Sequence, residues 1–219
     1  MSVIIAIDGP AGSGKSSVAK EAARRLNFGY LDTGAAYRAL AWAVLHGLIT
    51  LPPDRDADFV GFDYEISLDP DNYYVRSFGV DITEAIRGSE VANSVSSVAS
   101  HFGVRRWMKQ FTRNLVEQNE LKGVIVEGRD ITTVVAPDAP VRILLTASEA
   151  VRLDRRAKEL SEAELATLRQ QVLERDRNDS KVVDFMSPAE GVDLVDTTEL
   201  NFEQSVGAVL ELIAKQVKP

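Results

Sequence analysis

The sequence predicts an α/β fold in which a parallel sheet carries helices on both faces. Short apolar runs at 3–8, 124–126, 141–145 and 194–196 are typical of buried strands. Stretches in which apolar residues recur at helical spacing separate these runs. Strands that alternate with helices favour parallel pairing. A glycine-rich loop between the first strand and the first helix supports the same fold class, because ligands of such sheets bind beyond the carboxyl ends of the strands.

The loop after the first strand fits the phosphate-binding pattern G-x-x-x-x-G-K-[ST], the P-loop. With the serine that follows, its residues are Gly9, Pro10, Ala11, Gly12, Ser13, Gly14, Lys15, Ser16 and Ser17. Glycines let backbone N–H groups converge into an anion nest, and the next helix adds its positive end. Lys15 supplies charge to the β- and γ-phosphates, and Ser16 is placed to ligate Mg²⁺. The strand–loop–helix context disfavours a chance match and predicts binding of a nucleoside triphosphate.

The first half of the chain continues with two helices around a short strand. Apolar residues at helical spacing follow Lys15 as far as residue 26, and Asn27 ends that helix. Residues 30–32 are expected to form a strand end, and a second helix is expected over about 35–46. Gly47 is a suitable stop for this second helix.

The stretch 62–82 has a different character and predicts a small antiparallel sheet. It partly alternates, turns at 69–72 and continues in short apolar runs. Residues 86–113 are expected to be helical, with a break near Phe102 and Gly103.

Two capping patterns mark helices in the second half. Ser161 with Glu164 and Asn201 with Gln204 each have the spacing of a capping box. The chain is therefore expected to form one domain over 1–219, with the small sheet inserted into it.

Composition and charge limit the classes of function. The chain has 219 residues, no cysteine and a formal net charge of −8, with 45% hydrophobic and 26% charged residues. The lack of cysteine excludes disulfides, thiol catalysis and cysteine-based zinc sites. The acidic balance argues against binding of a nucleic-acid polymer. No long apolar run or signal-like N-terminus is visible, so we expect a cytoplasmic protein that contacts no membrane.

The segment 32–38 offers anion-binding groups at the start of a predicted helix. Thr33 and the first helical N–H groups are suited to hold an anion, and Arg38 lies one turn further on. An ordinary helix cap followed by a solvated arginine is the alternative interpretation.

A second charged segment follows the strand at 124–126. Glu127, Arg129 and Asp130 surround a glycine at the carboxyl end of this strand. Glu127 lies where a second acidic residue near Mg²⁺ is expected in this class of fold. A surface turn with a local ion pair remains the alternative.

Arginines recur in the last third of the chain. Arg152, Arg155 and Arg156 share one helical face, and Arg175 and Arg177 follow. Arginines on two helices and their connection predict a lid over a transferring phosphoryl group, because that reaction depends on positioning and charge neutralisation. A solvated basic face is the alternative.

Short motifs along nearly the whole chain match the motifs of one protein family. They lie at 7–16, 31–38, 91–96, 104–105, 127–130, 133–139, 175–180 and 195–198. Together they resemble the bacterial-type cytidylate kinases of the nucleoside monophosphate kinase family. The pair D-[ST]-G-x-x-Y-R and G-R-D-x-x-T-V-V, at 32–38 and 128–135, is far more specific than the P-loop.

The resemblance implies a fold, a reaction and a set of residues. It implies a P-loop core, a monophosphate-binding region over 33–115 that contains the small sheet, and a helical lid over about 150–182. The implied reaction transfers a phosphoryl group from ATP to CMP or dCMP with Mg²⁺.

The resemblance also assigns individual residues. It puts Lys15 and the loop on ATP, and assigns a catalytic role to Lys15, Arg129, Arg152 and Arg156. The substrate would be bound by Thr33, Arg38, Ser96, Arg105, Arg129, Asp130, Arg175 and Asp179. Of these, Asp130 would favour cytosine, because a carboxylate accepts from the exocyclic amine where uracil offers an acceptor.

One position departs from the family pattern. Family members often carry an arginine three residues after Asp179, where this chain has Val182 preceded by Lys181. A lysine would supply charge without the planar fork of arginine. The details of the phosphate clamp are therefore open.

Two other functions remain as alternatives. A different small-molecule kinase on the same core would respond to another acceptor. A nucleotide-dependent switch protein would bind ATP or GTP without stimulation by any monophosphate, although the Asn-Lys-x-Asp guanine motif of regulatory GTPases is absent. We expect a monomer in each case.

Overall fold

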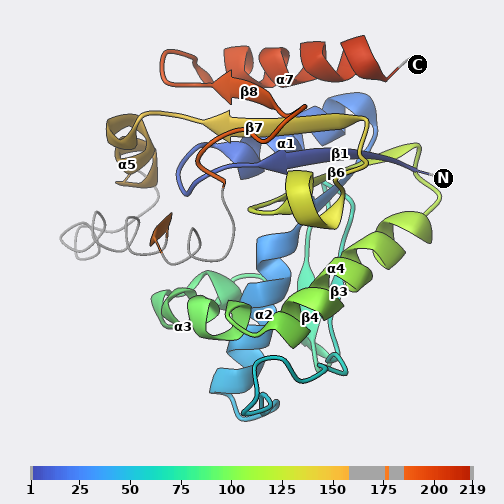
Figure 1. Ribbon diagram of the computed structural model, residues 1–219, viewed down its shortest axis with the longest axis vertical. Coiled ribbons are helices and arrows are strands. Elements are labelled where there is room, and N and C mark those ends of the chain that lie inside the picture. Colours follow the sequence, from blue (N-terminus) through green and yellow to red (C-terminus); the bar gives the residue numbers. More distant parts are fainter. Residues whose placement is uncertain (1, 158–175, 178–184, 218–219) are drawn as a thin grey trace.

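The centre of the molecule is a parallel sheet of five strands in the order β2-β6-β1-β7-β8 (Figure 1). The computed structural model describes residues 2–157, 176–177 and 185–217. The strands are β1 Val3–Asp8, β2 Gly29–Asp32, β6 Gly123–Gly128, β7 Val141–Thr146 and β8 Asp193–Asp196. Each neighbouring pair is parallel, which confirms the predicted fold class.

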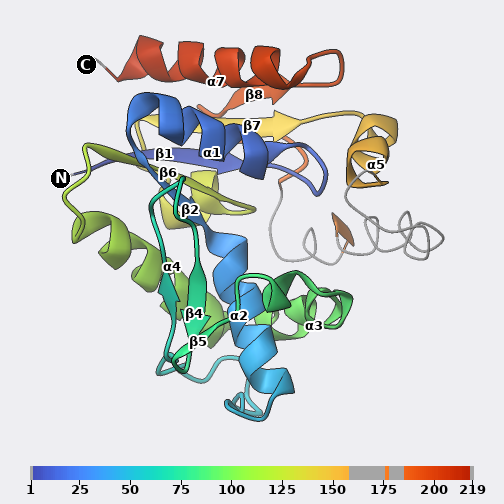
Figure 2. The same cartoon turned by 180° about the vertical axis from the view of Figure 1, so that it is seen from behind.

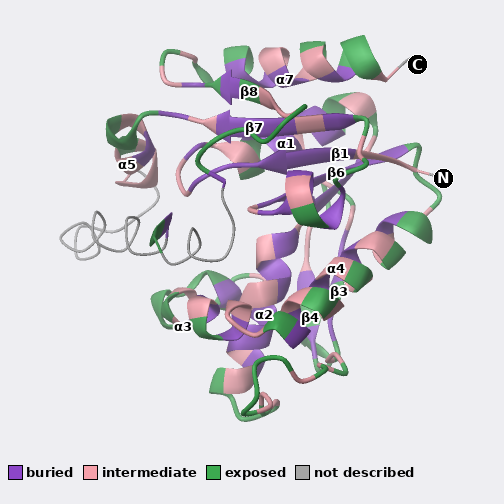
Figure 3. Ribbon diagram, viewed as in Figure 1, coloured by how far each residue is buried: buried purple, intermediate pink, exposed green. Residues whose placement is uncertain are grey.

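The apolar runs form the sheet because their side chains are buried on both faces. On one face, Ile5 and Ile125 pack with α1 Lys15–Leu26 and α7 Phe202–Gln216. On the other face, Ala6 pairs with Val126 and packs toward α2 Thr33–Leu45, α3 Ser89–Ala99 and α4 Phe102–Glu117. Figure 2 shows α1 in front of the sheet, and Figure 3 shows the central strands buried along most of their length. The predicted helices on both faces are therefore confirmed.

Helix boundaries follow from local chemistry at their ends. The first helix ends before Asn27, whose left-handed φ of 53° turns the chain toward β2. The second helix, α2 Thr33–Leu45, begins at the Asp32 cap, whose carboxylate accepts from the Ala35 N–H at 3.1 Å. The predicted start near 35 was therefore two residues late, because the cap immediately follows β2.

The predicted small antiparallel sheet is present, with shorter strands than expected. It consists of β3 Glu65–Ile66, β4 Val75–Ser77 and β5 Val80–Asp81. It is followed by η1 Ala85–Arg87, α3 Ser89–Ala99 and α4 Phe102–Glu117. The helical break lies at Ser100 and His101, just before the predicted position. Figure 1 places this whole group on the side of the sheet away from α7.

The second half contains one element that the sequence pattern did not indicate. A single π-helical turn, η2 Ile131–Val135, follows β6 and precedes β7. Helix α5 Glu149–Ala157 follows β7, and α7 begins at the predicted capping box of Asn201 and Gln204. The predicted capping box at Ser161 and Glu164 lies outside the described residues. None of the described helices has the length and apolar character needed to cross a membrane.

Candidate active site

The P-loop lies where β1 ends and α1 begins, and its backbone requires glycine at two positions. Gly12 and Gly14 have φ values of 75° and 88°, a region that favours glycine. Gly14 is also the cap of α1, so the loop leads directly into the helix N-terminus. This arrangement directs N–H groups toward a common point and suits an anion.

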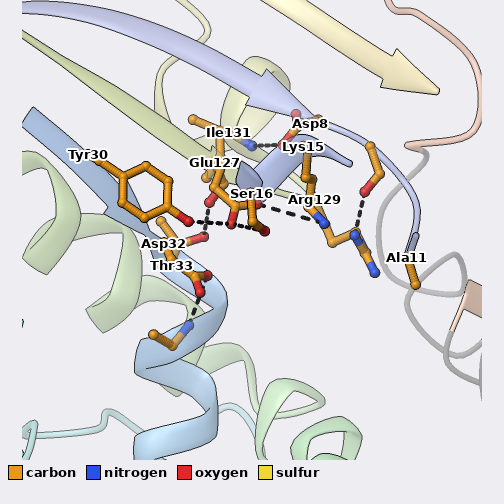
Figure 4. A network of polar contacts seen from close by, with 12 residues as sticks. Asp8, Ala11, Lys15, Ser16, Tyr30, Asp32, Thr33, Glu127, Arg129 and Ile131 are labelled. Carbon is orange, nitrogen blue, oxygen red and sulfur yellow. Dashed lines mark hydrogen bonds and ion pairs between the residues drawn. The ribbon is translucent and has the colours of Figure 1, made fainter. Parts of the chain in front are cut away.

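Glu127, at the end of β6, joins the P-loop to the neighbouring strands (Figure 4). The Ser16 hydroxyl donates to Glu127 Oε1 at 2.6 Å, and Lys15 Nζ lies 3.7 Å from Glu127 Oε2. The Tyr30 hydroxyl donates to Oε1 at 3.1 Å. Only 2% of Glu127 is exposed, which excludes the surface turn considered from the sequence.

Two carboxyl groups in this network have opposite pKa shifts. Burial, together with the negative charge of Asp32, raises the pKa of Glu127, although Lys15 and Ser16 oppose that shift. Burial also acts on Asp32, but the charges of Arg38 and Lys15 outweigh it and lower the pKa of Asp32. Asp32 therefore holds the more stable negative charge, and Glu127 depends on a nearby cation or donor to remain ionised.

Arg38 extends from α2 toward the same group. Its Nη2 donates to Asp32 Oδ2 at 2.5 Å, and its Nε is buried without a partner among the described residues. The charge of Asp32 outweighs burial and raises the pKa of Arg38. The Thr33 hydroxyl donates to the Glu127 carbonyl at 2.8 Å and ties α2 to β6. Arg38 is thus a largely buried, paired arginine and not the solvated residue of the alternative interpretation.

The segment after Glu127 brings Arg129 and Asp130 to two different neighbours. Arg129 Nη1 donates to the carbonyl of Gly9, at the start of the P-loop. Arg105 Nη2, from α4, donates to Asp130 Oδ2 at 2.5 Å. Arg105 and Asp130, both expected at the cytosine subsite, are therefore direct neighbours, and their contact with a base stays a prediction. Ser96 is half-buried on α3.

Arg152 of α5 contacts the P-loop directly. Only 5% of it is exposed, and its Nη1 donates to the carbonyl of Ala11 at 2.9 Å and to Asp176 Oδ2 at 2.5 Å. The Ala11 N–H in turn donates to Asp176 Oδ1 at 3.1 Å, and Arg129 Nη2 lies 3.7 Å from the same oxygen. A solvated basic face is excluded for Arg152.

The neighbouring arginines of α5 behave differently. Arg155 Nη1 donates to the Ser13 carbonyl at 3.0 Å and its Nη2 to the Thr197 carbonyl at 2.9 Å, so Arg155 braces the P-loop against the end of β8. Arg156 is half-buried on the same helix, and its role stays a prediction. Arg175 and Asp179, like Lys181 and Val182, lie outside the described residues.

Sequence reasoning missed two buried aspartates. Asp8, at the end of β1, accepts from the N–H groups of Ile131 and Thr132, and burial raises its pKa to about 6. Asp176 joins Arg129, Arg152 and the P-loop, as described above. An acidic residue that directly ends a wholly apolar strand was a usable signal for Asp8. Asp176 lies within the 175–180 motif, but nothing in that motif indicated its contacts with the P-loop and Arg152.

The chemistry of this region fits a hard cation bound with phosphate. The Ser16 hydroxyl and the Glu127 carboxylate supply oxygen, the ligand type that Mg²⁺ prefers. Across 2–157, 176–177 and 185–217, no group of three or more His, Asp or Glu side chains could hold a metal by itself. An ion here would therefore rely on phosphate oxygens, as Mg²⁺ does with nucleotides.

Known proteins resemble this chain along most of its length. The family model described as cytidylate kinase matches residues 5–215. The cytidylate kinase of Cutibacterium acnes is 42% identical over 96% of this chain and 96% of its own length. That of Rhodococcus opacus is 42% identical over 98% of this chain and 96% of its own.

Solved structures resemble the fold at low sequence identity. TT1252 from Thermus thermophilus is 17% identical, with a TM-score of 0.51 over 100% of this chain and 99% of that chain. At this identity the likeness concerns the fold alone.

Proposed function

The chain belongs to the cytidylate kinase family and is therefore a nucleoside monophosphate kinase, and we propose how its residues divide the work of phosphorylating CMP or dCMP with ATP. The observation that carries the proposal is the meeting of two groups at Glu127, near the end of β6. Ser16 and Lys15 of the P-loop contact this carboxylate. The paired Asp32 and Arg38, at the end of β2 and in α2, lie close enough for their charges to act on its pKa. The P-loop can thus hold the donor phosphates, and Arg38 the acceptor phosphate, close to the same buried carboxylate.

On the donor side, the P-loop binds the phosphates of ATP. Backbone N–H groups of the P-loop bind phosphate oxygens, and Lys15 adds charge to the β- and γ-phosphates. Ser16 would hold Mg²⁺ together with phosphate oxygens, with Glu127 beside it. When bound, the ion would neutralise charge on the phosphates.

On the acceptor side, Arg38 and Arg129 bind the phosphate of CMP. The planar guanidinium of each can form two parallel bonds to phosphate. Asp32 holds Arg38 in place before substrate arrives, so less freedom is lost on binding. Thr33 is the first residue of α2, so its backbone N–H belongs to the positive N-terminal end of that helix.

The transferring group is stabilised by arginines from the lid. Arg152, at the Ala11 carbonyl, and Arg156, on the same helix, belong to this set. Phosphoryl transfer spreads negative charge over the equatorial oxygens, so donors aimed at that position lower the barrier. Arg175 and Asp179 complete the lid contribution and meet the ribose.

Cytosine is read by Asp130, Arg105 and Ser96. Arg105 Nη2 donates to Asp130 Oδ2 at 2.5 Å, and this bond holds the Asp130 carboxylate in position. The carboxylate can then accept a hydrogen bond from the exocyclic amine of cytosine. We predict that Asp130→Asn lowers the preference for CMP over UMP by roughly tenfold, the scale of one base-edge contact. The ratio of kcat/KM for the two acceptors measures this, and an unchanged ratio would remove Asp130 from base recognition.

The proposal extends to the setting of the reaction. We propose a cytoplasmic monomer whose partners are the nucleotides ATP, CMP and dCMP. A net charge of −8, with Arg38, Arg129 and Arg152 gathered near the P-loop, favours small anions over a nucleic-acid polymer or a membrane surface.

The test is an ADP-release assay with Mg·ATP and a panel of CMP, dCMP, UMP, AMP, GMP and dTMP. We expect strong stimulation by CMP and dCMP alone. Another responsive monophosphate would keep the phosphate assignments and discard the base assignment. No response to the panel would favour another small-molecule kinase or a nucleotide-dependent switch.

A further inference from the structure

Asp8 is a buried carboxylate that no step of the proposed reaction uses. It ends β1, is 2% exposed and directly precedes the P-loop. Its Oδ1 accepts from the Ile131 N–H at 2.9 Å. Its Oδ2 accepts from the Thr132 N–H at 2.8 Å and the Thr132 hydroxyl at 2.6 Å. Three hydrogen bonds therefore converge on one buried carboxylate, whose two oxygens accept all of them.

The donors belong to the π-helical turn that follows Arg129 and Asp130. Within this turn, the N–H groups of Val134 and Val135 both donate to the Asp130 carbonyl, at 2.8 and 3.0 Å. The first N–H groups of a helical turn have no partner within it. The carboxylate of Asp8 satisfies two of them and so holds the start of the turn against the end of β1 (Figure 4).

The same short stretch connects both halves of the active site. Gly9 follows Asp8 in the chain, and its carbonyl accepts from Arg129. Asp130 precedes the residue that Asp8 binds, and it pairs with Arg105 of α4. The Asp8 contacts thus fix the position of Arg129 and Asp130 relative to the P-loop from the inside of the fold.

We propose that Asp8 is a positioning residue of the acceptor site, which sets where Arg129 and Asp130 stand relative to the donor loop. The inference rests on the proposed function, because it takes Arg129 and Asp130 as acceptor-binding residues. It goes beyond that function because it makes the position of the acceptor-binding residues depend on Asp8, a residue that contacts no nucleotide. Small displacements of positioning groups cost large factors in rate, so the effect is measurable in CMP kinetics.

The test uses two variants of the contact and two matched controls. Asp8→Asn keeps the shape but replaces one acceptor by an amide that faces a donor. Thr132→Val removes only the hydroxyl donor, whereas Thr132→Ser keeps it. Asp196→Asn alters a carboxylate that also accepts from a threonine N–H and hydroxyl, at 2.9 and 2.6 Å, on the exposed end of β8.

Asp8→Asn and Thr132→Val are expected to raise the KM for CMP by roughly ten- to a hundredfold and to lower the preference for CMP over UMP. The affinity for Mg·AMP-PNP, measured by calorimetry, is expected to change far less. Thr132→Ser and Asp196→Asn are expected to retain the wild-type values. This split separates positioning of the acceptor from general destabilisation, which would affect both nucleotides.

Normal CMP kinetics in folded Asp8→Asn and Thr132→Val would overturn the inference, and equal loss of both nucleotides would also overturn it. Asp130→Asn, assayed in parallel, tests the proposed function separately. If Asp130→Asn leaves the base preference unchanged, base reading by Asp130 fails, and the KM for CMP in the Asp8 and Thr132 variants still decides the positioning role. Thermal melts identify any variant that does not fold, and Thr132→Val then carries the test.

Discussion

Charged residues around the carboxyl ends of β2 and β6 differ sharply from those on the small antiparallel sheet. Glu127 near the end of β6, Asp32 at the end of β2 and Arg38 in α2 are largely buried. Asp32 pairs with Arg38, and Glu127 contacts Ser16 and Lys15. On the small sheet, Arg76 and Glu65 are 50% and 55% exposed and lie 4.0 Å apart. Both regions contain ion pairs, but only the first has pairs removed from water.

This difference indicates where the removal of a charged side chain should change stability or activity most. Water screens an exposed pair, so removal of one partner leaves the other solvated. A buried charge whose partner is removed has no such replacement, and the loss is several times larger. Substitutions should therefore have graded effects that follow burial, and four experiments test this expectation.

The largest effect is expected at Lys15, which lies at the centre of the buried group. Lys15→Ala should lower kcat by roughly a hundredfold or more, the scale of one strong contact to transition-state charge. It also removes a cation that helps keep Glu127 ionised. Steady-state kinetics with CMP measure the effect. Retained turnover would contradict the assignment of the P-loop. It would also contradict the expectation that buried charges have the largest effects.

The second effect concerns pH and the buried carboxyl of Asp8. Its pKa is raised from 3.8 to about 6 by burial, so the folded state holds a proton that the unfolded state releases. This group therefore favours folding at low pH, and its contribution is lost as the pH rises from about 4 to about 6. Relative to Asp8→Asn, the wild type should lose up to about 3 kcal/mol of unfolding free energy across that window.

Urea unfolding of both proteins at several pH values measures that difference. Asp196 is the matched control, because hydrogen bonds from Thr198 lower its pKa in an exposed position. Its contribution should have the opposite sign, present above the ordinary aspartate pKa and lost as the pH falls. The same pH dependence for Asp8→Asn and Asp196→Asn would show that burial does not set the sign of the effect.

The third effect concerns the buried pair of Arg38 and Asp32. Arg38→Lys keeps the charge but loses the planar fork, so the KM for CMP should rise about tenfold. Arg24→Lys is the matched control, because Arg24 makes its ion pairs with Glu21 and Asp71 on the exposed face of α1. That control should leave the kinetics unchanged. Similar kinetics for the two variants would argue against a phosphate contact by Arg38.

The smallest effect is expected on the small sheet. Arg76→Ala removes the pair with Glu65 and a contact over the Tyr74 ring at 4.5 Å. Exposed contacts of these kinds contribute less than about 1 kcal/mol together. Thermal melts and CMP kinetics should therefore remain close to the wild type. A large loss of activity would give the small sheet a functional role that its exposure does not indicate.

Much of the fold was predictable because its signals are local in sequence. The P-loop is eight consecutive residues, or nine with the serine that follows, and the Asn201–Gln204 capping box spans one helical turn. The burial of the strands follows from their apolar composition. The π-helical turn at Ile131–Val135 was not predictable in this way, because its start is held by Asp8, more than a hundred residues earlier in the chain.

By itself the sequence determined the α/β class, the phosphate loop and the residue types of the site. The tertiary structure alone decided the partners: Ser16 with Glu127, Ala11 with Asp176 and Asp8 with Thr132. Each pair is separated by more than a hundred residues, so its contact depends on strand order and register. Hydrophobic patterns state which residues are buried, but only the packed sheet brings two distant strand ends to the same place.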